Sequence, residues 1–445
     1  MPDASLTKRI LGLAIPSLGA LVAEPLFLLT DTAMVGHLGA AALASLGLAS
    51  TILTTVIGLL IFLAYATTPI VARRLGAGNK AGAISAGIDG LWLALGLGVT
   101  LGIVGSALTP WFVRFFDATT EVALDTEMYL GISWWGLPGM LLVIAATGLM
   151  RGLQDTRTPL WIALAGFAAN AALNALLIYG IDLGLRGSAL GTVIAQWAMA
   201  AVFLFIVGRE ARAHGVSVAP GMLGITSAAR SGSWLLLRTL SLRVALIATV
   251  FVATGLGTRE LAAWHIVFTL FSLLALALDS LAIAAQALIG HDLGSSDLAG
   301  VRSTTSTLMA WGFFAGGILA VMTGLLSPLL PFVMTSDGPL REVLLPVFVL
   351  LALTLPLSGF VFVLDGVLIG AGDGKYLALT GVLNVVMFAP FLWLASITEW
   401  VVSGVNLGGL LMLEAAFGVS YIGARALTLG LRARGERWMV PGESR

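Results

Sequence analysis

The sequence has no cysteine and very little charge. None of its 445 residues is cysteine, and only 10% are Asp, Glu, Lys or Arg. Without cysteine the chain can form no disulfide bond, thiol nucleophile or cysteine-ligated metal site, and its redox compartment stays undefined. The formal net charge of zero gives no indication of nucleic-acid binding. The class of protein must therefore be inferred from the uncharged majority of the chain.

That majority is strongly apolar. Hydrophobic residues make up 58% of the chain, and the mean hydropathy is +1.01. No soluble fold of this length has such a composition, so we predict a polytopic membrane protein. The apolar runs are about 20 to 28 residues long and do not alternate, which favours α-helices that span the bilayer. The predicted fold class is therefore all-α.

Twelve apolar runs are separated by polar loops. We predict membrane-spanning helices near residues 10–35, 43–71, 84–109, 124–149, 158–179, 188–208, 225–254, 262–290, 301–328, 342–368, 375–397 and 402–427. The longest connection, near 209–224, divides them into two groups of six. The expected organisation is an N-terminal six-helix lobe over 1–212, a cytoplasmic linker over 213–224, a C-terminal six-helix lobe over 225–430 and a cytoplasmic tail over 431–445.

Lysine and arginine are distributed asymmetrically over the connecting segments. If the N-terminus is cytoplasmic, the inner segments carry 17 of these residues, and this number includes Arg425 near the end of the last predicted span. The outer loops then carry four: Arg114, Arg186, Arg259 and Arg341. The positive-inside rule therefore predicts that both termini are cytoplasmic, in a protein that we expect in the plasma (inner) membrane.

The two halves resemble each other at a constant offset of 218 residues. Leu38-Gly39 matches Leu256-Gly257, Leu63-Ala64 matches Leu281-Ala282, and Gly148, Gly152 and Asp155 match Gly366, Gly370 and Asp373. Each half has six predicted spans, an even number, so both halves enter the membrane from the same side. A parallel pseudo-two-fold repeat is one of the two repeat plans of secondary transporters, whose sites lie near the midplane.

Two acids lie inside the first predicted span, Glu24 and Asp31. They are seven residues apart, about two helical turns, so we expect them on one face of the helix. An ionisable group in a membrane span is costly and usually faces a cavity or a partner. Asp31 is therefore the first candidate for a working residue. The alternative is a structural acid that is hydrogen-bonded between helices.

Four polar residues are predicted near the depth of Asp31. Asn170 and Asn174 are spaced i,i+4 in the fifth span, and Thr192 and Gln196 are spaced likewise in the sixth. The directions of the spans place Asn174 and Thr192 level with Asp31 and bring Asn170 close to Gln196. Burial disfavours an ionised carboxylate and hydrogen bonds stabilise it, so such a group can exchange a proton. The alternative is that these amides and hydroxyls only hold helices together.

The C-terminal lobe carries intramembrane charges of both signs. They are Arg238, Arg243, Asp279, Asp365 and Glu414. Arg238 and Asp279 are predicted at similar depth, where they could form an ion pair. Buried ion pairs are more often architectural than catalytic, so we assign these five residues a structural role.

Signals for catalysis or metal binding are weak. Gly370-Ala-Gly-Asp373 is similar to the Gly-x-Gly-Asp motif of intramembrane aspartyl proteases, but the chain has no Tyr-Asp pair that could supply the second acid. The four histidines show no metal-ligand spacing. We therefore predict no enzyme activity, no catalytic residue and no metal site.

Taken together, these residues resemble the multidrug and toxic compound extrusion (MATE) family, in its DinF-like branch, over the whole chain. The segments that carry the resemblance are Glu24–Gly39, Gly148–Arg157, Gly187–Gln196 and Phe362–Asp373. The resemblance implies cation-coupled export of organic, cationic or amphipathic drugs and toxic compounds by alternating access. It implies a protonation site at Asp31 with companions at Asn170, Asn174 and Thr192. With Glu24 and Gln196, placed by helix spacing and depth, these companions form the predicted coupling or substrate-binding network. The expected partners are a small organic substrate and the lipid bilayer, without nucleic acid, and the expected state is a monomer.

One departure from the family's pattern bears on the coupling ion. Many relatives have Asn-x-x-x-Asp-Pro in the fifth helix, whereas this chain has Asn170-Ala-Ala-Leu-Asn174-Ala175. Loss of the acid removes a hard anionic oxygen from any sodium site, so we favour proton coupling without another cofactor. Sodium-coupled export is an alternative, because an amide carbonyl can still bind sodium. A lipid-linked precursor flippase is another by analogy, although only Arg238 and Arg243 offer positive charge for a pyrophosphate.

Overall fold

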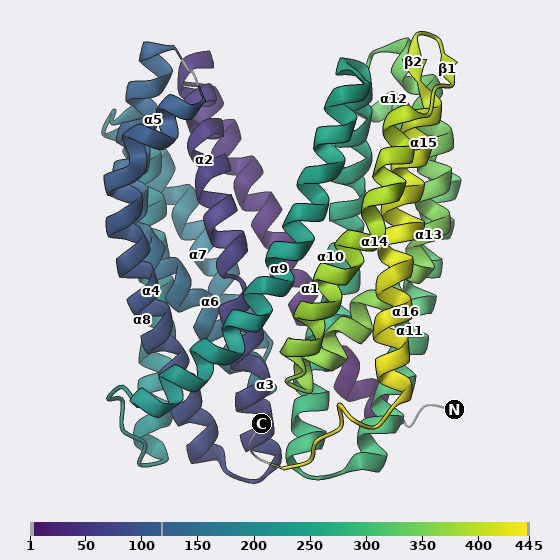
Figure 1. The fold of residues 1–445 in the computed structure, drawn as a ribbon. Coiled ribbons are helices and arrows are strands. Elements are labelled where there is room, and N and C mark those ends of the chain that lie inside the picture. The colour runs from purple at the N-terminus through teal and green to yellow at the C-terminus, as the bar shows by residue number, and fades with distance from the viewer. Residues whose placement is uncertain (1–3, 117–118, 443–445) are drawn as a thin grey trace. The chain divides into compact units, whose positions relative to one another are not determined.

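The computed structural model describes residues 4–116 and 119–442, and almost all of them are helical (Figure 1). Residues 443–445, the end of the predicted tail, lie outside the described part of the chain. The first half contains α1 (Ala4–Gly36), α2 (Ala40–Leu60), α3 (Phe62–Gly76), α4 (Lys80–Phe115), α5 (Thr120–Ser133), the 3₁₀ helix η1 (Trp134–Gly136), α6 (Leu137–Gly152), α7 (Arg157–Ala175), the π-helix η2 (Leu176–Gly180) and α8 (Gly184–Ala213).

The second half continues with nine helical segments and one short hairpin. It contains α9 (Met222–Leu256), α10 (Thr258–Gly294), α11 (Leu298–Leu326), α12 (Leu330–Met334), α13 (Gly338–Gly370), α14 (Gly374–Ile397), β1 (Val401–Val402), β2 (Val405–Asn406), α15 (Leu407–Ala415), the π-helix η3 (Ala416–Tyr421) and α16 (Ile422–Arg434). The strands β1 and β2 pair antiparallel, with Val401 opposite Asn406.

Twelve stretches of the described chain are long and apolar enough to cross a membrane. Four of them combine consecutive segments: α2 with α3, α5 with α6 through η1, α7 with η2, and α15 with α16 through η3. Nine of the stretches extend the predicted spans at both ends, and all twelve keep the predicted order. The sequence-based prediction of an all-α, twelve-span membrane protein is therefore confirmed.

The chain divides into two compact units. The N-terminal unit comprises Gly12–Gly232, and the C-terminal unit comprises the described residues 4–11 and 233–442. The division falls within α9, after the predicted linker over 213–224. That linker packs against α4, because Gly221 N donates to Asp89 Oδ1 at 2.8 Å and Trp92 Nε1 donates to the Val218 carbonyl at 3.0 Å.

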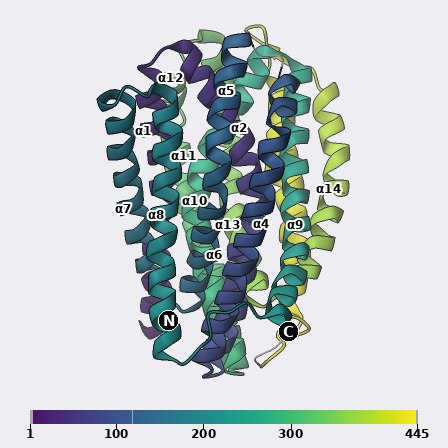
Figure 2. The same ribbon diagram turned by 90° about the vertical axis from the view of Figure 1, so that its left-hand side faces the viewer.

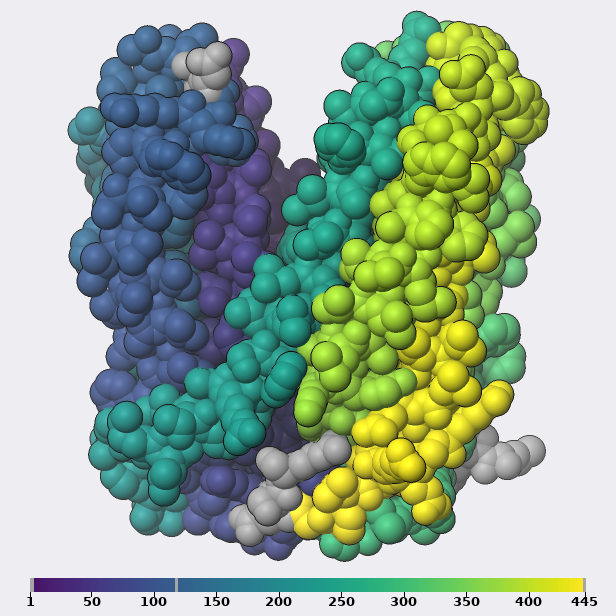
Figure 3. Space-filling model, viewed as in Figure 1, coloured from purple at the N-terminus to yellow at the C-terminus, as the bar shows by residue number. Residues whose placement is uncertain are grey.

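Each unit has a largely buried segment among its other helices. In the N-terminal unit the stretch Thr120–Gly152, which includes α6, is the most buried, and α4, α5 and α8 pack beside one another on one face (Figure 2). In the C-terminal unit α13 packs against both α10 and α11, while α14 lies on the face that Figure 3 turns to the viewer. The enclosed helices α6 and α13 belong to corresponding spans, the fourth and the tenth.

The two units repeat the same close backbone contacts. A Cβ at Gly148 would lie 2.8 Å from Ala64 Cα, and a Cβ at Gly366 would lie 2.7 Å from Ala282 Cα, both pairs being 218 positions apart. Only glycine permits helices to approach this closely. The caps repeat as well, since Asn79 Oδ1 accepts from Gly82 N at 2.7 Å and Asp297 Oδ1 accepts from Gly300 N at 2.8 Å. The sequence repeat is therefore a structural repeat.

Candidate functional site

Asp31 is buried in the N-terminal unit, on α1. Asp31 is only 7% exposed, and its Oδ1 accepts two hydrogen bonds. The donors are Asn174 Nδ2 of α7 at 2.7 Å and Ser188 Oγ of α8 at 2.9 Å. No described residue donates to the other carboxylate oxygen, Oδ2. The carboxyl group thus joins three helices, and its second oxygen can take a proton.

A chain of amides extends from Asp31 along α7. Asn174 Nδ2 also donates to Asn170 Oδ1 at 3.1 Å, and Asn170 Nδ2 donates to Thr192 Oγ1 of α8 at 3.2 Å. Both asparagines are buried, because their i,i+4 spacing turns them to the same side of α7. The sequence predicted that Asp31, Asn170, Asn174 and Thr192 would lie at similar depth. In the structure these four residues form one continuous hydrogen-bonded chain.

Two further residues belong to this cluster and were missed from the sequence. Ser188 donates directly to Asp31, and Tyr129 of α5 is buried within hydrogen-bonding reach of Ser188 and Thr192 and close enough to Asp31 to interact with its charge. Ser188 lies one helical turn before Thr192, so the spacing could have identified it. Tyr129 lies five residues inside the outer end of the predicted span 124–149, so depth could have placed it level with Asp31, but only the fold shows that it faces the cluster. We call Tyr129, Ser188 and the four-residue chain the Asp31 cluster.

Small residues on α8 allow this cluster to form. A Cβ at Gly187 would lie 2.7 Å from the Leu177 carbonyl carbon, and a Cβ at Gly191 would clash with Asn174 Oδ1. The spacing Gly187-x-x-x-Gly191 therefore lets α8 approach α7 and η2 closely. The π-helix η2 begins two residues after Asn174, and π-helical turns frequently occur at functional sites.

The Asp31 cluster contains no positive charge. Every described side chain that donates to Asp31 is a neutral amide or hydroxyl. The buried Asn174 Oδ1 has no hydrogen-bond donor among the described residues. Amides and hydroxyls can each donate and accept. The cluster can therefore adapt to either protonation state of the carboxyl group by turning its donors and acceptors.

Two residues of the predicted network lie outside the Asp31 cluster. Glu24 is on α1 but exposed, whereas Asp31 is buried. Pro25 lies between them inside the helix, where it removes a backbone hydrogen bond and disturbs the regular spacing. Gln196 does not bond to Asn170. It packs instead against Gly136 of η1, where a Cβ would clash with Gln196 Oε1.

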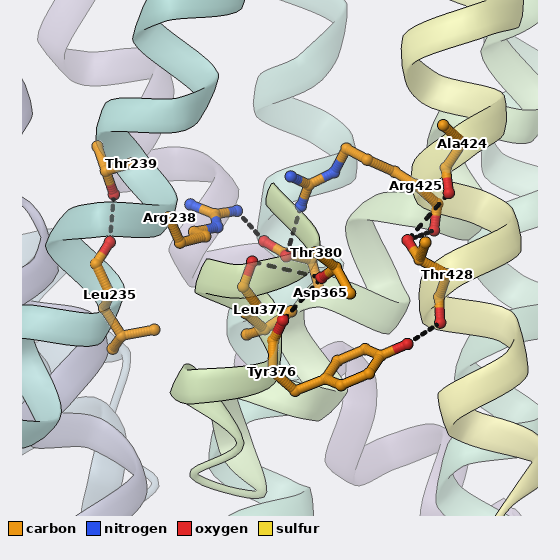
Figure 4. A network of polar contacts seen from close by, with 10 residues as sticks. All are labelled: Leu235, Arg238, Thr239, Asp365, Tyr376, Leu377, Thr380, Ala424, Arg425 and Thr428. Atoms are coloured by element: carbon orange, nitrogen blue, oxygen red, sulfur yellow. Dashed lines mark hydrogen bonds and ion pairs between the residues drawn. The ribbon is translucent and has the colours of Figure 1, made fainter. Parts of the chain in front are cut away.

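The C-terminal unit contains a cluster of opposite character around Asp365 (Figure 4). Asp365 of α13 is buried, and its two oxygens accept from two arginines, Arg425 of α16 at 2.6 Å and Arg238 of α9. The sequence assigned Arg425 to the inner loops, whereas the structure buries it in α16. Nearby, Tyr376 Oη donates to the Thr428 carbonyl at 2.7 Å. We call Arg238, Asp365 and Arg425 the Asp365 cluster.

The remaining charges predicted in this unit differ in burial. Glu414 of α15 is 1% exposed, and its Oε1 has no hydrogen-bond donor among the described residues. Asp279 of α10 is half-buried, and Arg243 of α9 is exposed. Within residues 4–116 and 119–442, no group of three or more His, Asp or Glu side chains is placed to hold a metal ion. The two clusters therefore offer proton exchange and ion pairing as their available chemistry.

Comparison with known proteins gives one family. A family model described as MatE matches residues 16–176 and 235–394. The chain is 27% identical over 413 residues to Protein DETOXIFICATION 44, chloroplastic, of Arabidopsis thaliana, covering 89% of this chain and 79% of that relative. It is also 27% identical over 300 residues to DNA damage-inducible protein F of Escherichia coli, covering 65% of this chain and 64% of that protein.

Solved structures share the fold. The chain is similar to the MATE transporter VcmN of Vibrio cholerae in its bent form, with a TM-score of 0.87 and 20% sequence identity. The alignment covers 98% of this chain and 99% of that one. At this identity the similarity shows that the architecture is the same and carries no assignment of residue roles.

Proposed function

The chain belongs to the MatE family, as the sequence resemblance predicted, and on this premise we propose that it exports organic compounds, cationic or amphipathic in character, in exchange for protons. The observation that carries the proposal is the Asp31 cluster. A buried carboxyl group that is held only by neutral donors can gain or lose a proton without breaking an ion pair. Proton uptake at such a group changes its charge and its hydrogen bonds together.

Protonation of Asp31 would reverse the direction of the amide chain. A protonated carboxyl group donates, and Asn174 Oδ1 has no donor of its own among the described residues. Rotation of the Asn174 amide would turn this oxygen to Asp31. Asn170 and Thr192 can follow, because each of them both donates and accepts. The attachment of α1 to α7 and α8 would then differ between the two protonation states.

The rearrangement would act through α1. This helix contains two prolines, Pro16 and Pro25, and each interrupts its backbone hydrogen bonds. In the proposed cycle, Asp31 takes up a proton from the outside and α1 changes its bend, so that substrate is expelled. The outward-closed protein then releases the proton to the cytoplasm and takes up substrate there. The ion binds one conformation more tightly than the other, as any coupled transport cycle requires.

Asn174 supports the choice of proton over sodium. Sodium, like other hard cations, is held best by several anionic or carbonyl oxygens. In the Asp31 cluster the only carboxylate is that of Asp31, and Asn174 presents its Nδ2 to Asp31. Sodium-coupled export by the same site is the second candidate. Its single supporting observation is the Asn174 Oδ1 atom without a donor among the described residues, which could serve as one ligand.

The site of action follows from the same premise. We propose the plasma membrane, with both termini in the cytoplasm, because the predicted inner segments carry most of the Lys and Arg residues. A monomer would suffice, because the Asp31 cluster lies within one unit of one chain.

Purified protein in liposomes with an acidic lumen and a pH-sensitive dye would test the proposal. A cationic substrate is added outside, with and without sodium, to wild type and Asp31→Asn. We expect substrate to cause proton loss from the lumen in wild type, independently of sodium, and no response in Asp31→Asn. Glu24→Gln serves as the control acid on the same helix and should behave as wild type. Sodium-dependent exchange without a proton signal would overturn proton coupling.

A further inference from the structure

A crevice opens on the C-terminal unit, apart from both clusters. It has a volume of about 580 Å³ and lies between α11, α13 and the segment that follows α16. Its polar end is formed by Arg302, Thr305 and Ser306, near the start of α11. Its apolar end is formed by Met309, Phe313 and Phe314, farther along the same helix. The crevice thus passes from a charged to an aromatic lining over about 12 residues, or about 18 Å of helix.

Thr305 has an unsatisfied hydroxyl group at the polar end. The residue is 6% exposed and lines the crevice, yet its Oγ1 has no hydrogen-bond partner among the described residues. Its neighbour Thr304 donates to Asp292 Oδ2 at 3.1 Å, and helical threonines such as Thr67 donate to the carbonyl one turn earlier. A buried hydroxyl without a partner is destabilising. Rotation of the Thr305 side chain about its Cα–Cβ bond would bring Oγ1, which solvent does not reach in this structure, to an acceptor in the crevice.

The guanidinium group of Arg302, near Thr305, forms only a weak ion pair. Arg302 forms an ion pair with Glu436, and the two side chains are 55% and 73% exposed. An ion pair this exposed contributes little to stability, so another anion can replace Glu436. A phosphate suits this exchange, because arginine binds phosphate through two parallel hydrogen bonds. We therefore expect the polar end to bind a phosphate group more tightly than it binds the solvent-exposed carboxylate of Glu436.

The other end of the crevice fits a hydrocarbon chain. Phe313 and Phe314 are 53% and 67% exposed on a helix that crosses the membrane, so lipid surrounds them. Trp438, in the segment that follows α16, is fully buried and lines the crevice on that side. A ligand that satisfies both ends must carry an anionic head and an apolar tail. A soluble phosphate would fill only the polar end.

We propose that this crevice binds one anionic phospholipid. Its phosphate replaces Glu436 at Arg302 and accepts the hydrogen bond that Thr305 Oγ1 offers. One acyl chain lies along Met309, Phe313 and Phe314. The site belongs to the C-terminal unit alone and does not depend on the coupling ion proposed above.

Native mass spectrometry of the full-length protein in a neutral detergent tests the proposal. Short-chain phosphatidylglycerol is the probe, with phosphatidylcholine of equal chain length as the neutral comparison. We expect wild type to retain one phosphatidylglycerol in preference to phosphatidylcholine. Thr305→Val and Arg302→Gln should each lower this affinity about tenfold, which corresponds to the loss of one hydrogen bond to a charged group. Glu436→Gln should raise it, because it frees Arg302.

Arg302→Gln and Glu436→Gln are expected to change the affinity for phosphatidylglycerol in opposite directions. This difference separates ligand binding from a structural role. If the ion pair only fixed the chain's end, Arg302→Gln and Glu436→Gln would change lipid retention in the same direction. Arg259→Gln, which removes another exposed arginine that is paired with Asp337, is the matched control and should leave retention unchanged. Equal retention of both lipids by wild type, a fall in retention in Glu436→Gln, or complete displacement by glycerol 3-phosphate would overturn the proposal.

Discussion

Asp31 and Asp365 are both buried aspartates on membrane-spanning helices, one in each of the two repeating units. Asp31 is held by a neutral amide and a neutral hydroxyl, whereas Asp365 is held by two guanidinium groups. A charge that is surrounded by opposite charges stays ionised, because neutralising it would remove the carboxylate that pairs with both arginines. A charge that is surrounded by neutral donors can be neutralised at little cost. The two repeating units thus share a backbone arrangement but differ in the side chains that bond to their buried aspartates.

This difference assigns the two clusters different tasks. The Asp365 cluster joins α9, α13 and α16 and acts as a permanent connection within its unit. The Asp31 cluster joins α1, α7 and α8 by bonds that can reverse direction. Substitutions that exchange these properties, or weaken one of them, test whether the comparison holds.

The largest effect is expected from Asp365→Asn. The substitution leaves Arg238 and Arg425 without their carboxylate, and breaking a buried ion pair in this way costs about 3 to 5 kcal/mol. We expect a clearly lower midpoint in thermal unfolding of the detergent-solubilised protein. Glu342→Gln, which changes an exposed acid on the same helix, serves as the control. An unchanged midpoint in Asp365→Asn would contradict a structural role for the Asp365 cluster.

A smaller loss is expected from Gly191→Ala. The added methyl group clashes with Asn174 Oδ1, so α7 and α8 must separate or Asn174 must turn away from Asp31. Overpacking of this kind costs about 1 to 3 kcal/mol, and proton-coupled transport should fall with it. Gly208→Ala on the same helix is the matched control, since a Cβ there would meet nothing within 4 Å. If both variants retained full transport, close packing at Gly191 would not be required for the site.

The substitution Asn174→Asp is expected to change the coupling ion and to leave the fold intact. It places a second carboxylate beside Asp31, and the two acids together form a better site for a hard cation. We expect sodium to stimulate substrate exchange in this variant and not in wild type, measured by substrate flux into liposomes at constant pH. Asn174→Gln, which keeps the amide, is the control for altered size. Failure of sodium to act on Asn174→Asp would mean that residue 174 does not determine the coupling ion.

The smallest effect is expected from Thr192→Val. It removes the acceptor of the Asn170 Nδ2 bond at the far end of the chain and leaves Asp31 directly bonded. The expected loss is about 0.5 to 1.5 kcal/mol of stability, with a modest fall in transport. Thr100→Val removes a hydroxyl that bonds only to its own helix and should be neutral. A loss of transport as large as that of Asp31→Asn would show that Thr192 itself carries the coupling.

Much of this arrangement could be predicted from the sequence, because membrane spans and their spacing follow from local rules. Apolar runs gave the twelve helices, and the i,i+4 spacing put Asn170 and Asn174 on one face. Depth alone brought Asp31, Asn174 and Thr192 to one level. All of these inferences use positions along a helix, which the sequence specifies.

Rotation of the helices about their own axes could not be predicted in the same way. Glu24, seven residues before Asp31 on α1, is exposed and forms no hydrogen bond with the described residues, whereas α7 and α8 donate to Asp31. Gln196 turns towards η1 because Gly136 leaves space there. Arg425 pairs with Asp365 only because α16 packs against α13. Each of these outcomes depends on contacts between segments that are distant in the chain.

The central claim is that Asp31 changes its protonation state while it remains buried. The infrared difference spectrum between neutral and acidic pH, recorded in lipid, detects the carbonyl band of a newly protonated carboxyl group. The account predicts such a band in wild type and in Glu24→Gln, and its loss in Asp31→Asn with the amide bands unchanged. An undiminished band in Asp31→Asn would show that another carboxyl group takes up the proton and would contradict the account.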